Sequence, residues 1–222
     1  MPFSADELHS IPLVISAPRF ATYLSECYGD KKAALELYEW NLSLSCALFL
    51  PLHMLEVSIR NAICEAIELS YGANWPWTTS FEISLPSPHP PNFNPRRTLV
   101  NTRNNHATVG KVIADMKFAF WQNMFTGRHD GPIWNHHLKT VLPNSPNNKT
   151  VQVRRRELYD ALNVIRVLRN RIAHHEPIFR RNIISELDLI IKVVRWRDVK
   201  TAEWLIRVEN VSAHLNHGPY LP

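Results

Sequence analysis

The sequence predicts an all-α protein with a single domain over residues 1–222. Apolar residues recur three and four positions apart through most of the chain, as on the buried face of a helix. No segment of useful length alternates apolar and polar residues as a half-buried strand does, and no internal repeat is visible. The chain is long enough for one well-buried core. We therefore expect a helical bundle with additional helices, with loose termini at residues 1–17 and 209–222.

The first helices are predicted from their end signals. Asp30 can cap a helix whose apolar residues recur at helical spacing: Leu35, Tyr38, Leu42 and Cys46. Pro51 can occupy the first turn of a second helix, which Gly72 closes. The segment Trp75–Pro95 holds six of the sixteen prolines, so we expect an irregular loop there.

The remainder of the chain keeps the helical pattern. One long helix carries an apolar stripe made of Leu158, Leu162, Ile165, Leu168 and Ile172. Pro177 disfavours helical backbone at Glu176, so this helix should end near His175. The expected helices are Arg96–His106, Val109–Phe125, Ile133–Leu142, Lys149–His174, Asn182–Val194 and Val199–Val208.

The composition indicates a cytoplasmic protein that is not associated with a membrane. The three cysteines are odd in number and widely spaced, which is typical of reduced thiols and of neither a disulfide framework nor a zinc site. We do not expect secretion, because no N-terminal stretch shows a basic start followed by an apolar run and a small-residue cleavage site. Its longest apolar run, Cys46–Leu55, is too short to cross a bilayer.

Positive charge is concentrated in one part of the chain. Residues 151–207 contain 13 Lys and Arg against 7 Asp and Glu, whereas the other residues contain 12 against 13. Such a local surplus is typical of a surface that binds phosphate groups, with RNA or DNA as the first candidates. The alternative is a solvated basic face without a partner.

The stretch VLRNRIAHHEPIF, Val167–Phe179, places a dense set of polar residues at the end of the long helix. Asn170 and His174 are four residues apart and share a helix face, whereas Arg169 and His174 diverge by about 140°. One helix cannot easily aim both Arg169 and His174 at a single phosphate. Two copies related by a two-fold axis can, because each supplies what the other lacks.

These residue types suit RNA cleavage without a metal ion or another cofactor. Histidine can take the proton of a ribose 2′-hydroxyl or give one to the leaving 5′-oxygen. Arginine can hold the phosphate oxygens while negative charge develops, and Asn170 can orient the histidine or the hydroxyl. The spacing alone is also compatible with purely structural roles, in which Arg169 forms a surface ion pair and His174 caps the last helical turn.

Four stretches resemble a known family in the same order. LRNRIAHHEPIF is similar to the C-terminal signature of Abi-like (abortive infection) proteins of the HEPN superfamily, which has Arg, a polar residue and His after a short spacer. The other three resemble the family's N-terminal helix and its two central segments: LEVSIRNAI, GKVIADMKFAFWQNMF and IWNHHLKTVLPN. The resemblance covers Leu35 to Val194. Lys117 and Ala119 depart from it, since a small hydroxyl residue and a glycine are usual there.

The resemblance implies an all-helical fold, a homodimer formed through the helix that carries Arg169 and His174, and metal-independent RNase activity, as in many HEPN members. Arg169 and His174 match the hallmark pair, and Asn170 matches its polar second residue. We therefore expect a ribonuclease of a bacterial phage-defence or toxin–antitoxin system, with RNA as substrate and a small RNA or an antitoxin as a candidate partner. The alternatives are a non-catalytic RNA-binding or sensor module and a helical scaffold.

Glu56, Arg60 and Asn61 lie in an otherwise apolar helix. Glu56 and Arg60 have the spacing of an ion pair, which forms either a structural contact or a support for the hallmark residues. In both cases this helix should pack beside the hallmark helix.

Several residues around the hallmark pair have two interpretations each. His175 and Glu176 either support the site or simply end the helix. A further group forms either an RNA-binding basic surface or a solvated cluster: Arg154, Arg155, Arg156 and Arg171.

Overall fold

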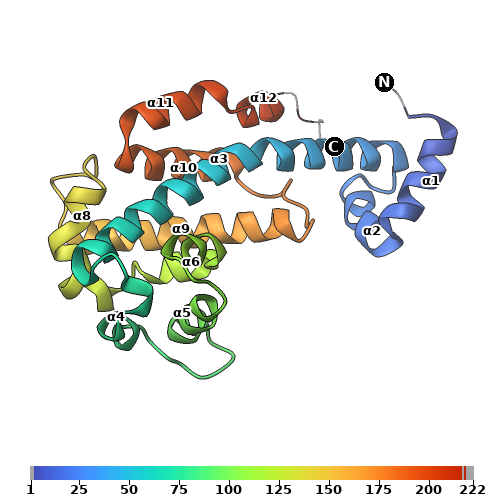
Figure 1. The fold of residues 1–222 in the computed structure, drawn as a ribbon. Helices are drawn as coiled ribbons and strands as arrows, with labels where there is room; N and C mark the ends of the chain where they lie inside the picture. The colour runs from blue at the N-terminus through green and yellow to red at the C-terminus, as the bar shows by residue number, and fades with distance from the viewer. Residues whose placement is uncertain (1–2, 217, 219–222) are drawn as a thin grey trace.

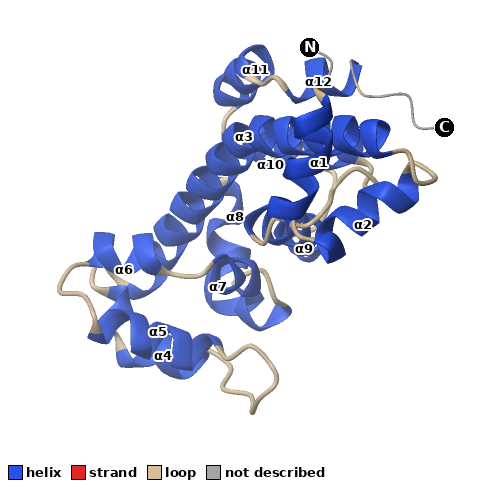
Figure 2. Cartoon of the chain, turned by 90° about the vertical axis from the view of Figure 1, so that its right-hand side faces the viewer, coloured by secondary structure: helices blue, strands red, loops and turns tan. Residues whose placement is uncertain are grey.

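The computed structural model describes residues 3–216 and 218, and this part of the chain is all helical, as predicted. No strand occurs among these residues (Figure 2). Single turns of 3-10 or π helix occur at Trp75–Trp77, Gly127–His129 and Asp130–Trp134. The α-helices are α1 (Ala5–Ile15), α2 (Ala17–Glu26), α3 (Lys31–Tyr71), α4 (Thr79–Ser84), α5 (Pro95–Asn104), α6 (Val109–Asp115), α7 (Phe118–Asn123), α8 (Asn135–Val141), α9 (Val151–Ala173), α10 (Ile183–Arg197), α11 (Val199–Val208) and α12 (Val211–Asn216).

The long helix α3 organises the fold. It runs across the molecule between the α1–α2 pair at one end and the short helices α4 to α6 at the other (Figure 1). Helices α9 and α10 pack along it, and α11 packs on α10. The main core lies between these elements, and its largest fully buried side chains include Trp75, Trp121, Trp134, Phe81 and Phe120.

The helix break predicted at Pro51 is wrong, because α3 continues through this residue. A proline inside a helix removes one hydrogen bond and costs roughly 3 kcal/mol. Burial offsets that cost, since Pro51 is itself buried and the neighbouring turns place fully buried leucines in the core: Leu44, Leu48 and Leu55. The predicted ends are confirmed. The Asp30 side chain accepts hydrogen bonds from the Lys32 and Ala33 amides, and Gly72 ends the helix with a positive φ of 85°.

Among the described residues, α3 is long and apolar enough to meet the length and composition criteria for a membrane span. This is weak evidence, because the central helix of a soluble protein meets the same criteria. Many side chains of α3 are buried against other helices of the same chain.

The other helices agree with the predictions except at two segments. The Pro-rich segment Trp75–Pro95 is less irregular than expected, since it contains the turn Trp75–Trp77 and helix α4 before a loop leads to α5. The helix expected over Val109–Phe125 is divided into α6 and α7. Lys117, one of the two departures from the Abi-like pattern, has extended backbone at this division.

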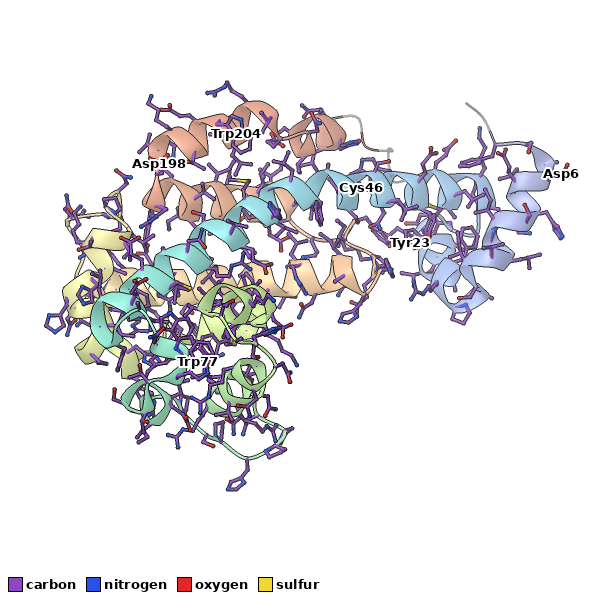
Figure 3. The ribbon with its side chains drawn as sticks, in the orientation of Figure 1. Asp6, Tyr23, Cys46, Trp77, Asp198 and Trp204 are labelled. Carbon is purple, nitrogen blue, oxygen red and sulfur yellow. The ribbon has the colours of Figure 1, made fainter. Side chains whose placement is uncertain are left out.

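Within the described residues, the two end segments carry more structure than the loose termini we expected, and residues 1–2, 217 and 219–222 of those segments lie outside the described part. Helix α1 begins with a capping box formed by Ser4 and Glu7, and α12 follows α11. Helices α1 and α2 and the first turns of α3 build a second, smaller hydrophobic cluster, to which Phe179 also contributes. Tyr23 of α2 lies beside α3 in this cluster, with its ring 5.1 Å from that of Tyr38 (Figure 3).

Candidate functional site

Helix α9 packs beside α3 as predicted, and Arg169 lies at their contact. Its Nε atom is 4.0 Å from a carboxylate oxygen of Glu56, and its side chain is 45% exposed. Arg169 and Glu56 both line a half-open cavity of about 300 Å³. We call this cavity the Arg169 pocket. Its polar and aromatic lining residues are Phe49, His53, Glu56, Arg60 and Arg169, and its apolar walls include Leu52, Val57 and Ile172.

The ion pair predicted between Glu56 and Arg60 does not form in the described part of the chain. Glu56 turns instead toward Arg169, which approaches from α9. The Nε atom of Arg60 is buried and has no hydrogen-bond partner. Glu56 and Arg60 therefore both line the Arg169 pocket, whereas Asn61 is exposed and does not line it.

His174 lies at a different cavity of the same chain. With His175 it lines a depression of about 230 Å³ between α2 and the end of α9. We call this depression the His174 pocket, and its other polar lining residues are Arg19, Thr22, Tyr23, Tyr38 and Glu176. Arg169 and His174 thus do not share a cavity within one copy, which agrees with their divergence on the helix.

The end of α9 is fixed by its backbone. His175 has a positive φ of 57°, and its amide donates to the Ile172 carbonyl at 3.0 Å. The Glu176 amide donates to the Arg171 carbonyl at 2.8 Å. These two bonds form a Schellman motif, in which the left-handed position usually holds glycine. The predicted helix end near His175 is confirmed, and the motif holds the His174 and His175 side chains at an exposed corner.

Asn170 is half-buried on the last turns of α9. Its backbone carbonyl accepts a hydrogen bond from the His174 amide at 2.9 Å. Its side-chain amide makes no hydrogen bond with the described residues. Any residue at this position would make that backbone bond, and the Asn170 side chain lines neither the Arg169 pocket nor the His174 pocket.

Three of the four arginines expected to bind RNA have structural partners instead. Arg154 is buried and donates to the Ser145 hydroxyl at 3.0 Å. Arg155 donates to Asp130 and to the Phe125 carbonyl, and only 13% of its side chain is exposed. Arg171 donates to the Pro177 carbonyl at 3.0 Å and lies 3.5 Å from Glu176. Arg154 and Arg155 therefore stabilise the packing around α9 and form neither the basic surface nor the solvated cluster considered from the sequence, whereas Arg171 stays 37% exposed.

Arg156 is the remaining member of that group. Its side chain is 68% exposed, and its Nε atom lies 3.0 Å from Asp160, one helical turn away. Its guanidinium also lies over the Tyr159 ring. Arg156 is therefore a solvated surface charge with a local partner.

The sequence interpretation missed His53 as a site residue. Phe49, His53, Glu56 and Arg60 follow one another at steps of four, three and four, which places them on one face of α3. The spacing shows that these four residues share a helix face. It does not identify them as site residues unless α9 is known to pack against that face.

No group of three or more His, Cys, Asp or Glu side chains is arranged to hold a metal ion in the described part of the chain. Comparison with protein-family models, with curated proteins and with solved structures finds no match. The resemblance to Abi-like proteins therefore rests on the four sequence stretches alone.

Proposed function

We propose that this chain is a metal-independent endoribonuclease of a bacterial abortive-infection or toxin–antitoxin system and that it acts in the cytoplasm. The observation that carries the proposal is the position of Arg169 and His174. Both line accessible cavities with mixed polar and apolar walls near the end of one helix, the first with a second arginine and the second with a second histidine. This is the set of groups that cleavage of RNA by its own 2′-hydroxyl requires.

The proposed reaction uses two copies of the chain. Arg169 of one copy holds the non-bridging oxygens of the scissile phosphate, and a histidine reaches the phosphate from the other copy. One base removes the 2′-hydroxyl proton, the 2′-oxygen bonds to phosphorus, and the bond from phosphorus to the 5′-oxygen breaks. An acid returns a proton to that 5′-oxygen. The products are a 2′,3′-cyclic phosphate end and a 5′-hydroxyl end.

Incubation of the purified protein with total RNA in EDTA tests this function. We expect cleavage with cyclic-phosphate ends, a loss of rate of at least about 100-fold for His174→Ala and a loss of about 100- to 1000-fold for Arg169→Ala. His136→Ala is the matched control, because His136 is an exposed histidine on α8, outside both pockets. Full activity in His174→Ala would refute the assignment.

A second candidate function is a non-catalytic RNA-binding or sensor module. It is favoured by the separation of Arg169 and His174 into two cavities within one copy. This candidate predicts RNA binding that weakens steeply with salt and produces no cleavage.

A further inference from the structure

We infer that the Arg169 pocket binds one nucleotide of a single-stranded RNA, with its phosphate between Arg60 and Arg169 and its base stacked on Phe49. The choice of RNA as the ligand rests on the proposed function. The position of the nucleotide rests on the charges, burial and ring geometry of the pocket itself.

The cationic side of the pocket lacks an acceptor. Two guanidinium groups face one carboxylate, and that carboxylate approaches Arg169 only at 4.0 Å. The Arg60 Nε atom is buried without a hydrogen-bond partner. Arg60 as a whole is only partly buried and lines the pocket, so a phosphate oxygen there is bound by the outer nitrogens of its guanidinium and not by the buried Nε atom. Arginine is well suited to this task, because its planar fork matches the oxygens of a phosphate group.

The other side of the pocket offers an aromatic surface. Phe49 is 71% exposed, although a phenylalanine on a packed helix is ordinarily buried. Its ring lies beside that of His53, with centroids 6.2 Å apart and planes inclined by only 23°. Exposed aromatic rings beside positive charge are the usual binding surface for unpaired bases, which stack on the ring while the backbone contacts the cations.

A second copy of the chain is the competing occupant of this surface. Phe49 continues a row of exposed residues on α3 that also contains Leu42 and Cys46. An apolar interface packed directly on Phe49 would also remove Arg60 and Arg169 from water without giving them an acceptor, so the second copy of the proposed reaction has to reach the phosphate without covering this ring. The nucleotide satisfies the ring and both guanidiniums together, so the charges favour it.

The test measures RNA binding in a protein that cannot cut. The full chain carrying His174→Ala is titrated into a fluorescently labelled single-stranded RNA in EDTA. In this background we expect Phe49→Ala to weaken binding about 10-fold or more and Phe49→Trp to retain it, because stacking needs only a flat ring. Arg60→Ala should weaken binding and lower the salt slope by about 0.7, the value for one phosphate contact on a single strand.

The matched control is Leu69→Ala, which removes an exposed apolar side chain from the same helix outside the pocket and should leave binding unchanged. Thermal unfolding of each variant shows that the fold is retained, and its molar mass in solution reports the oligomeric state. Adenosine 3′-monophosphate is used as a competitor. Displacement of the RNA at an equal concentration would identify a free nucleotide as the ligand and overturn the assignment to a strand.

The outcomes separate this inference from the proposed activity. Unchanged binding in Phe49→Ala, or conversion of a dimer to a monomer by that substitution, overturns the nucleotide site while RNA cleavage stands. Binding that depends on Phe49 and Arg60 in a wild-type protein that does not cut RNA supports the site and refutes the ribonuclease. Cleavage by the wild-type protein without measurable binding by the His174→Ala protein overturns the site alone.

Discussion

Acidification should destabilise this protein through His129. The His129 side chain is only 1% exposed, and neither ring nitrogen has a hydrogen-bond partner. Burial, together with the nearby charge of Arg128, lowers the pKa of His129 from 6.5 to about 4. The folded state therefore holds this imidazole neutral at pH values at which the unfolded chain already binds a proton.

The direction and size of the effect follow from the two pKa values. Because the folded pKa is the lower one, stability is fully present above about pH 6.5 and is lost as the pH falls toward 4. Between pH 7 and pH 5 the loss is about 2 kcal/mol, and it approaches about 3 kcal/mol below pH 4. A loss of this size is a large part of the free energy of unfolding of a typical domain.

Urea denaturation at pH 7 and pH 5 measures this loss. The matched variant is His129→Leu, which removes the titrating group and both unpaired nitrogens while keeping a side chain of similar size. Its free energy of unfolding should change by about 2 kcal/mol less between the two pH values than that of the wild type. An equal change in both proteins would show that His129 titrates normally and would refute the reasoning.

Two further predictions concern the end and the beginning of α9. His175→Gly should stabilise the protein by about 0.5–1 kcal/mol, since glycine adopts the left-handed backbone of this residue without strain; a lower urea midpoint would show that the imidazole contributes more than the strain costs. Arg154→Ala should cost about 1–2 kcal/mol through the lost packing and the lost hydrogen bond to Ser145, with RNA affinity unchanged. Arg156→Ala should change stability by less than about 0.5 kcal/mol, because its ion pair is exposed. Similar losses of unfolding free energy in Arg154→Ala and Arg156→Ala would contradict the expected difference between the buried and the exposed arginine.

The helices were predictable where the signals are local. The bounds of α11 agree fully with the prediction, and α9 agrees within two residues, because caps and apolar spacing determine both. The break at Pro51 was predicted wrongly because a local signal cannot show how much apolar surface the continuous helix buries. Helix α1 was missed although Ser4 and Glu7 give a local signal for its start, because Pro12 interrupts its helical pattern and none of its residues is fully buried.

The candidate site was predictable in part. The sequence indicated that Arg169 and His174 point in different directions and that the helix carrying Glu56 packs beside them, and both features are present. It could not show that Arg154 and Arg155 are held by Ser145 and Asp130, because these partners come from other segments. His53 was missed because the face of α3 that meets α9 is set by tertiary packing.

The continuous α3 helix has a consequence for how this protein can be divided. Its first turns belong to the small N-terminal cluster and its remaining turns to the main core, so one rigid rod joins the two. Tyr38 of α3 lines the His174 pocket. Residues between Phe49 and Arg60 of the same helix line the Arg169 pocket, and Pro51 lies within that stretch. A protease cut inside this rod would disrupt both cavities at once. Shortened versions of the chain should therefore keep α3 whole.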